Sequence, residues 1–98
     1  MIKKILFRKV ALVEIDESYR WYENQRQGLG EELILFLEET IEKITRNPDF
    51  YPLVHKNVRR AIVRRFPYGI YYIIEKSKLV VIAVFHGSRN PKSWKNRV

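Results

Sequence analysis

Two groups of cationic side chains are the part of this sequence best suited to chemistry. One group lies between residues 56 and 65, the other follows residue 88, and three tyrosines lie between them. A guanidinium group binds phosphate or carboxylate through paired hydrogen bonds, and a tyrosine ring can stack on a nucleobase. The pattern therefore predicts a basic surface for an acidic partner. Its members are Lys56, Arg59, Arg60, Arg64, Arg65, Tyr68, Tyr71, Tyr72, Arg89, Lys92, Lys95 and Arg97.

Each of these side chains also has a structural interpretation. A single arginine on a strand is often a solvated edge charge, and the tyrosines can belong to the core. Two further side chains leave the same choice open. His86 could act as an acid or base near neutral pH, or it could be a hydrogen-bonded structural histidine. Trp94 could recognise a partner, or it could pack a C-terminal turn onto the domain.

The composition agrees with an acidic partner. The 98 residues include 19 Lys+Arg and 11 Asp+Glu, which gives a net charge of +8. A charge of this sign favours nucleic acid, an acidic protein or an anionic surface. The length predicts a single domain over residues 1–98, and the 13 % aromatic content indicates a packed core rather than a disordered chain.

Several classes of site need residues that this sequence lacks. It contains no cysteine, which excludes thiol catalysis and zinc–thiolate sites and is typical of a reducing compartment. Gly28 and Gly30 open a helix without a preceding strand, so they do not form a phosphate-binding loop. We therefore expect no metal and no cofactor. The apolar N-terminal stretch is broken by Arg8 and Lys9, and no apolar run could cross a bilayer, so we expect a cytoplasmic protein without membrane association.

The basic surface needs a scaffold, and the apolar pattern predicts one. A first strand is expected from Ile2 to Phe7, and a first helix from Val10 to about Gln25–Gly28. A second helix should run from about Glu31 to Arg46 and end before Pro48. The expected buried residues are Leu12, Ile15, Tyr19 and Tyr22 in the first helix, and Leu33, Leu37, Thr40, Ile41 and Ile44 in the second.

Three more strands should follow a loop at Asp49–Asn57. They are expected at Val58–Arg65, Ile70–Glu75 and Leu79–Phe85, with a tight hairpin at Lys76-Ser77. The last is almost wholly apolar, which indicates a central strand. The order β-α-α-β-β-β predicts an α+β two-layer sandwich, in which a helical hairpin packs on a mainly antiparallel four-stranded sheet and a short C-terminal turn follows. The first strand should lie beside the last, in a direction that the sequence leaves open.

The stretch VRRAIVRRFPYGIYYIIEKSKLVVIAVFHGSRNPKSW, Val58 to Trp94, resembles the RelE/ParE toxin superfamily, whose members are often labelled plasmid stabilisation proteins. The preceding WYENQRQGLGEELILFLEETIEKITRNPDFYPLV is similar to the helical hairpin and proline-containing loop of that family. The resemblance covers nearly the whole chain. Its most specific parts are the patterns FPY-x-IYY and HG-x-R-x-P-x-x-W.

The resemblance implies the sandwich fold and one of two activities. RelE-like members cleave mRNA on the ribosome without a metal, and they use cationic side chains and a tyrosine to stabilise the transition state. ParE-like members poison DNA gyrase instead. Members of both kinds are neutralised by a cognate antitoxin. The resemblance thus implies an antitoxin partner, together with gyrase or, alternatively, the ribosome and mRNA.

Individual positions favour the ParE-like branch. Arg89 stands where the ribonucleases carry an arginine, and Arg60 stands near one of their lysines. Gly69 and Lys95, however, occupy the positions of their second arginine and their catalytic tyrosine. A ribonuclease that uses other groups, including Tyr72, stays open as the alternative, and its candidate catalytic residues are Arg60, Arg64, His86 and Arg89. The expected target- or antitoxin-binding residues are Arg59, Arg60, Arg64, Arg65, Tyr72, Arg89, Trp94 and Lys95. We expect the antitoxin to lie over the sheet and its basic groups.

Overall fold

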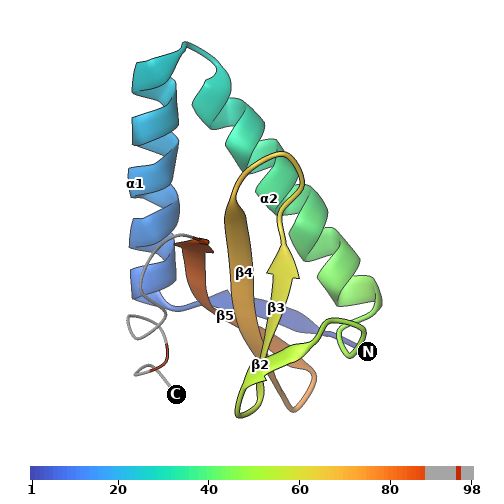
Figure 1. Ribbon diagram of the computed structural model, residues 1–98. Coiled ribbons are helices and arrows are strands. Elements are labelled where there is room, and N and C mark those ends of the chain that lie inside the picture. Colours follow the sequence, from blue (N-terminus) through green and yellow to red (C-terminus); the bar gives the residue numbers. More distant parts are fainter. Residues whose placement is uncertain (88–94, 96–98) are drawn as a thin grey trace.

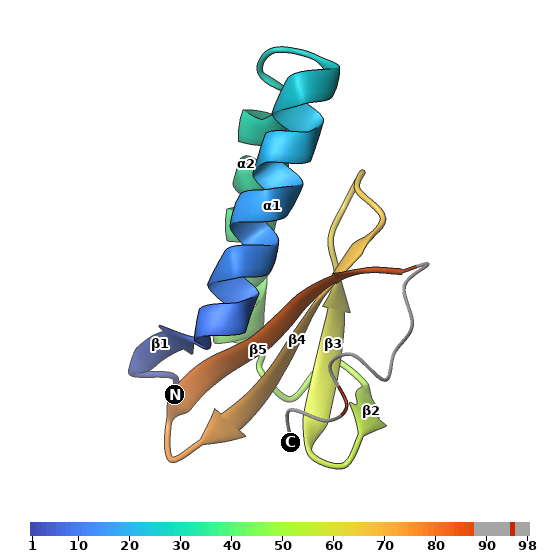
Figure 2. The same ribbon diagram turned by 90° about the vertical axis from the view of Figure 1, so that its left-hand side faces the viewer.

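Two long helices pack on one face of a five-stranded sheet in the computed structural model of the protein (Figure 1), which describes residues 1–87 and residue 95. Figure 2 shows both helices on the same side of the sheet. This is the expected two-layer α+β arrangement. The elements are β1 (Lys4–Phe7), α1 (Lys9–Gln25), α2 (Leu29–Arg46), β2 (Leu53–His55), β3 (Val58–Ile62), β4 (Tyr68–Glu75) and β5 (Lys78–His86).

The sheet differs from the prediction in strand number and direction. Its order is β1-β5-β4-β3-β2, so it has five strands rather than four, and β1 runs parallel to β5 in an otherwise antiparallel sheet. The additional strand, β2, lies in the segment predicted as a loop. Three residues are too few to show the alternation that marks a strand in a sequence. The expected neighbourhood of β1 and β5 is confirmed.

The helical hairpin is confirmed, and one carboxylate holds its turn. Gly28 precedes α2 with a φ of 89°, a left-handed conformation that favours glycine. Glu23 of α1 accepts hydrogen bonds from the backbone N–H groups of Gly28 and Gly30, both at 2.9 Å. A Cβ atom at position 30 would lie 2.6 Å from the carbonyl oxygen of Tyr19. The two helices can therefore approach closely only because residue 30 is a glycine.

The buried face of α2 was predicted correctly, and that of α1 only in part. Leu33, Leu37, Thr40 and Ile44 are buried, and Ile41 is half-buried. In α1, however, Leu12 is 51 % exposed, and the buried residues are Ala11, Glu14 and Ser18. The prediction for Leu12 was wrong because it followed apolar spacing alone, whereas the face against the sheet includes small and polar side chains.

Glu14 is buried because it completes the hydrogen bonding of β5. The register places β1 beside only the first part of β5, from Lys78 to Val81. Beyond that point α1 packs against β5, and Glu14 Oε1 accepts a hydrogen bond of 3.0 Å from the backbone N–H of Val84. A buried N–H group needs such a partner. The pairing of β1 with β5 ends at Val81, and the buried Glu14 carboxylate supplies the hydrogen-bond acceptor for Val84 beyond that point.

The central position of β5 is confirmed. It pairs with β1 and β4, and its residues from Leu79 to Phe85 are buried. Lys76 and Ser77 join β4 to β5 with φ angles of 48° and 70°, as in a type I′ hairpin turn. One buried cluster joins the sheet to the helices, and a second lies within the sheet and contains no helical residue.

The expected C-terminal turn lies outside the described residues, apart from Lys95. No helix among the described residues is long and apolar enough to cross a membrane.

Candidate partner-binding site

Strand β3 divides the predicted basic cluster between the two faces of the sheet. Alternation places Val58, Arg60 and Ile62 on one face and Arg59 and Ala61 on the other. Ala61 belongs to the cluster that contacts the helices, and Val58 belongs to the cluster without helical residues. The arginines at positions 59 and 60 therefore point in opposite directions. We call the face that carries Arg60 the helix-free face.

Arg59 anchors the loop that follows α2. Its Nη1 donates hydrogen bonds to the carbonyl oxygens of Asp49, at 3.1 Å, and Tyr51, at 2.6 Å. Its Nη2 lies 3.7 Å from the Asp49 carboxylate, and its side chain is only 22 % exposed. The described structure therefore uses this guanidinium group to close the loop onto the sheet.

Arg64 and Arg65 lie in the turn after β3, close to α2. The Arg64 Nη2 donates to a Glu39 carboxylate oxygen at 2.9 Å, and its guanidinium carbon lies 4.9 Å from the centre of the Phe36 ring. Arg65 lies 5.6 Å from the same ring centre and has a left-handed φ of 68°. The Arg64 hydrogen bond, more than any other cause, lowers the pKa of Glu39 below its usual value. Both arginines therefore belong to the helical side of the molecule.

Arg60 makes no ion pair with any of the described residues. It is half-buried, and its Nε is buried without a hydrogen-bond partner. Its aliphatic stem lies over Gly69 of β4, where a Cβ atom would come within 3.1 Å of Arg60 Cγ and 3.2 Å of Cδ. The neighbouring Tyr71, which pairs with Arg60 in register, is buried. Packing thus restrains the stem of Arg60, while its Nε has an unused donor.

The three tyrosines of the predicted basic surface are core residues, in agreement with their structural interpretation. Tyr72 has no exposed area, and its hydroxyl donates to the carbonyl oxygen of Pro48 at 2.7 Å. Burial raises its pKa to about 12, although the nearby charge of Arg59 acts in the opposite direction. Tyr68 and Tyr71 are 8 % and 6 % exposed. The expectation that Tyr72 lies on a contact surface is therefore contradicted, because its apolar ring fills the space beneath the loop.

His86 lies at the end of β5, apart from Arg60. Its ring stands edge-on to Tyr68, with the ring centres 5.3 Å apart. Lys95 is described and half-buried. The predicted site residues Arg89 and Trp94 lie outside the described residues. His86 pairs in register with Tyr68, which belongs to the cluster that contacts the helices, so strand alternation places His86 on the opposite face of the sheet from Arg60.

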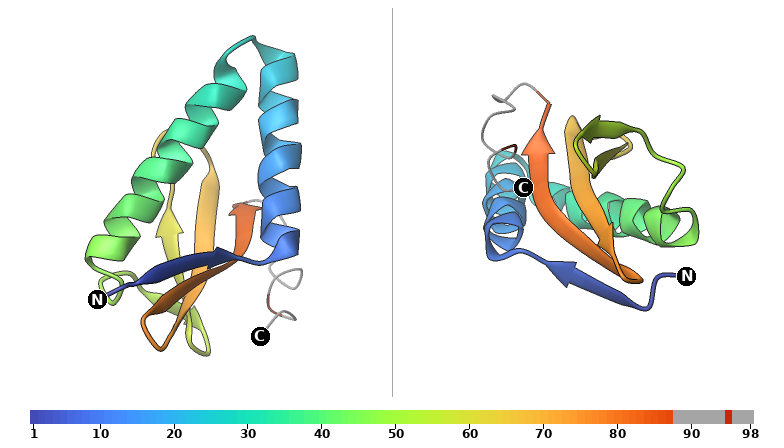
Figure 3. Two further views of the ribbon diagram at one scale, coloured as in Figure 1. Left: turned by 180° about the vertical axis from the view of Figure 1, so that it is seen from behind. Right: turned by 90° about the horizontal axis from the view of Figure 1, so that it is seen from below.

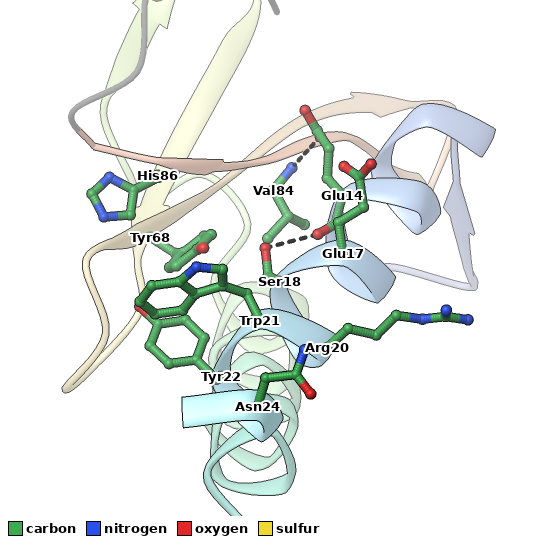
Figure 4. A pocket seen from close by; sticks show the side chains of 10 residues that line it. All are labelled: Glu14, Glu17, Ser18, Arg20, Trp21, Tyr22, Asn24, Tyr68, Val84 and His86. Carbon is green, nitrogen blue, oxygen red and sulfur yellow. Dashed lines mark hydrogen bonds between the residues drawn. The ribbon is translucent and has the colours of Figure 1, made fainter. Parts of the chain in front are cut away.

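A pocket of about 670 Å³ lies between α1 and the ends of β4 and β5 (Figure 4). The indole of Trp21 and the rings of Tyr22 and Tyr68 line it, with His86 beside Tyr68, and Glu14 of α1 also lines the pocket. Burial, followed by the proximity of Tyr68, raises the pKa of Tyr22 above its usual value. Neither Trp21 nor Glu14 is among the site residues predicted from the sequence. The sequence signals that could have identified them are a tryptophan within a predicted helix and a carboxylate between apolar residues.

Groups that could hold a metal ion are absent from the part of the chain that the structure describes, since no three His, Asp or Glu side chains gather there. The candidate site has two parts. One is the restrained guanidinium group of Arg60 on the helix-free face, and the other is the aromatic pocket beside α1. Such groups can bind anionic or aromatic parts of a partner.

Comparison with known proteins identifies the family. A family model described as the ParE toxin of the type II toxin–antitoxin system, parDE, matches residues 5–91. Among solved structures, a chain from a study of the chromosomal ParDE toxin–antitoxin system of P. aeruginosa superposes with a TM-score of 0.77 and 12 % sequence identity. The match covers 88 % of this chain and 96 % of that one, and at this identity it establishes the shared fold. The search of curated proteins gives no match.

Proposed function

Because the chain belongs to the ParE family of type II toxin–antitoxin toxins, we propose that it inhibits DNA gyrase and that an antitoxin relieves this inhibition. The family assignment makes the protein a toxin component with a cognate antitoxin as its partner. In this proposal residues 1–98 act as a single toxin domain in the cytoplasm, where its target works.

The surroundings of Arg60 are the observation that supports inhibition by binding rather than RNA cleavage. The resemblance places a ribonuclease arginine at the position of Gly69, and here the stem of Arg60 fills the space beside that glycine. Ribonuclease activity requires several donors around one reacting phosphate. The described residues supply one restrained guanidinium group on this face, with His86 elsewhere. One such group is well suited to a contact with a carboxylate or phosphate of a partner.

A supercoiling assay tests this proposal directly. Purified protein is added to gyrase, ATP and relaxed plasmid, and we expect supercoiling to fall as the protein concentration rises. Preincubation with the cognate antitoxin should restore it. The parallel experiment is toe-printing on programmed ribosomes. Clean ribosome-dependent mRNA cleavage together with undisturbed gyrase would overturn the proposal and identify the ribosome as the target.

The binding roles of the remaining predicted residues stay proposals. Arg60 is the member that we retain on the basis of its described surroundings, and Arg89 and Trp94 are retained on the resemblance alone. Arg59 and Tyr72 are occupied with the loop after α2, so we leave them out of the proposed contact surface.

A further inference from the structure

The aromatic pocket beside α1 is lined by acidic side chains, although the chain has a net charge of +8. The two helices separate from their common turn, so that α1 lies over β5 while α2 lies over β3 and β4 (Figure 3). The charged residues that line the pocket are Glu14, Glu17 and Arg20. The Nε of Arg20 lies 3.1 Å from the Asp16 carboxylate, and Figure 4 shows this side chain extending away from the aromatic rings. The lining thus has an excess of negative charge.

Glu17 and Trp21 are the lining residues best placed to meet a ligand. They are four residues apart in α1, so their side chains are neighbours on the helix surface, with Cβ atoms about 6 Å apart. Glu17 is exposed and makes no ion pair with a described residue. Trp21 is 58 % exposed, and its indole stands edge-on to the Tyr22 ring, with the ring centres 4.9 Å apart. This contact restrains an aromatic surface that is still open to solvent.

The inner wall of the pocket is held by packing and hydrogen bonds. The rings of Tyr22 and Tyr68 contact each other, with their centres 6.1 Å apart, and Tyr68 is buried. Glu14 accepts the hydrogen bond from the backbone of Val84, and the hydroxyl of Ser18 donates to the backbone carbonyl of Glu14 at 2.8 Å. The pocket is therefore formed before any ligand binds, which lowers the entropic cost of binding.

The aromatic rings and the carboxylates of this lining both attract a cation and repel a phosphate. The face of an aromatic ring carries partial negative charge, and a carboxylate carries a full one. Groups of three side chains that could hold a metal ion do not occur among the described residues, so an organic cation suits this lining better. A guanidinium group is planar, stacks on aromatic faces and donates paired hydrogen bonds to a carboxylate, whereas an ammonium group is a strongly hydrated point charge. An indole and a carboxylate one helical turn apart therefore favour guanidinium.

We propose that this pocket binds an alkylguanidinium group, the chemistry of an arginine side chain. The guanidinium plane stacks on the Trp21 indole, its N–H groups donate to the Glu17 carboxylate, and the alkyl chain lies against Tyr22 and Tyr68. The volume of about 670 Å³ leaves room for the molecule that carries the group. That molecule is a protein with an exposed arginine or a free guanidino compound. The inference goes beyond the proposed function, because it assigns a ligand to a site that does not include Arg60.

The first experiment measures binding to the full-length toxin by NMR. Nα-acetyl-arginine methylamide is titrated near neutral pH while the indole N–H signals are followed, and Trp94→Phe identifies the signal that belongs to Trp21. We expect saturable shifts at Trp21 with a dissociation constant on the order of 1 mM. The matched probe is the citrulline analogue, which has nearly the same shape without the charge and should bind about tenfold more weakly. Equal binding of the two analogues, or no saturable shift at Trp21, would overturn the proposal.

Variants of the lining test the two assigned contacts, with binding followed at the backbone amides of α1. Glu17→Gln keeps the size of the side chain but removes its charge, and it should weaken binding of the arginine analogue about tenfold. Its control is Glu38→Gln, at an exposed position of α2 outside the pocket. Trp21→Ala should weaken binding by a similar factor, and Trp21→Phe should restore part of the affinity. Phe50→Ala removes an exposed ring elsewhere and is the aromatic control.

Unchanged binding by Glu17→Gln would overturn the proposal, because this carboxylate is the group that selects a cation. Thermal melts identify any variant that fails to fold. Trp21→Phe keeps the stacking contact testable if Trp21→Ala is unfolded, since binding by Trp21→Phe at the full affinity of the wild type would contradict stacking on the larger indole.

The source of the guanidinium group is identified with the protein partners. Gyrase inhibition and antitoxin binding are each measured for the wild type, Glu17→Gln and Glu38→Gln. A loss of about tenfold that is specific to Glu17→Gln in one assay assigns the arginine to that protein. No loss in either assay assigns the pocket to a free guanidino compound, for which agmatine is the probe. Because the NMR titration contains no gyrase, a toxin that binds the arginine analogue without inhibiting gyrase would refute the proposed function and leave this inference standing.

Discussion

Arg59 and Arg60 are adjacent in the sequence and chemically identical, yet the fold uses them differently. Arg59 points toward the helices and binds the backbone of Asp49 and Tyr51. Arg60 points to the helix-free face, where packing over Gly69 restrains its stem and its Nε has no described partner. One arginine holds a loop in place, and the other remains able to bind something outside the chain.

The difference shows that a basic cluster in a sequence is not one surface. Strand alternation divides the cluster, and the loop after α2 then occupies one part of it. Arg64 and Arg65 join the helical side through Glu39 and Phe36. The net charge of +8 still attracts acidic partners at a distance. Which arginines can contact such a partner depends on the face of the sheet on which each arginine lies.

Replacing Arg60 should give the largest functional effect. We expect Arg60→Ala to reduce gyrase inhibition about thirtyfold, the size typical of a restrained arginine at the centre of an interface. Its melting temperature should stay close to that of the wild type, because no described ion pair is lost. The supercoiling assay measures the loss of gyrase inhibition, and a thermal melt measures the melting temperature. Full gyrase inhibition by a folded Arg60→Ala protein would contradict the partner-binding role assigned to Arg60.

Gly69→Ala displaces Arg60 without removing it. The added Cβ would lie 3.1 Å and 3.2 Å from the arginine stem and 3.3 Å from the Tyr71 ring. We expect gyrase inhibition to fall less than in Arg60→Ala and the free energy of unfolding to decrease by about 1 kcal/mol. Supercoiling and urea denaturation measure the two effects. If inhibition by Gly69→Ala is normal, the position of Arg60 over the glycine is not needed for function.

Replacing Arg59 should affect stability rather than function. Arg59→Ala leaves loop carbonyls without their donor, and we expect the free energy of unfolding to fall by about 1–2 kcal/mol. Urea denaturation measures this, and gyrase inhibition per folded molecule should not change. The pKa of Tyr72, which burial raises to about 12, should rise further because the charge of Arg59 now lowers it. A pKa that did not rise in ultraviolet titration would show that Arg59 does not act on Tyr72.

The raised pKa of Tyr72 also gives a pH dependence. The folded protein keeps the Tyr72 proton up to about pH 12, whereas the unfolded chain releases it near the usual value of 10. The unfolded state therefore binds fewer protons in this interval, and the contribution of Tyr72 to stability is lost as the pH rises from 10 toward 12. Tyr72→Phe should remove this part of the alkaline destabilisation in a denaturation series. Tyr72→Phe is also the control for the ultraviolet titration of Arg59→Ala, because it lacks the Tyr72 hydroxyl.

Replacing Arg64 should give the smallest effect. Its ion pair with Glu39 is largely exposed, so we expect no measurable change in melting temperature for Arg64→Ala. The pKa of Glu39 should rise toward its usual value, since the Arg64 hydrogen bond is the main cause of its lowering. In the wild type, the small contribution of this pair is present above the unfolded pKa of Glu39 and is lost as pH falls. NMR titration of the Glu39 carboxylate would reveal the shift, and an unchanged pKa would contradict the contact.

Much of the fold could be predicted because its elements carry local signals. α2 has an apolar stripe at helical spacing, and β5 is an apolar run bounded by a hairpin turn. β2 was missed because three residues carry no periodic signal. Leu12 was wrongly placed in the core because apolar spacing cannot show that Ala11, Glu14 and Ser18 lie against the sheet. The site was harder to predict, since the sequence pattern around Tyr72 is compatible with a recognition residue and with a core residue.

The helical hairpin, the central strand, the positive charge and the resemblance to a toxin family can all be inferred from the amino-acid sequence. These follow from hydrogen bonds and side-chain periods that extend over a few residues. The parallel direction of β1, the burial of Glu14 against Val84 and the different roles of Arg59 and Arg60 become visible in the folded chain alone. Those depend on contacts between residues far apart in the chain, whose partners are set by how the layers pack and not by local sequence.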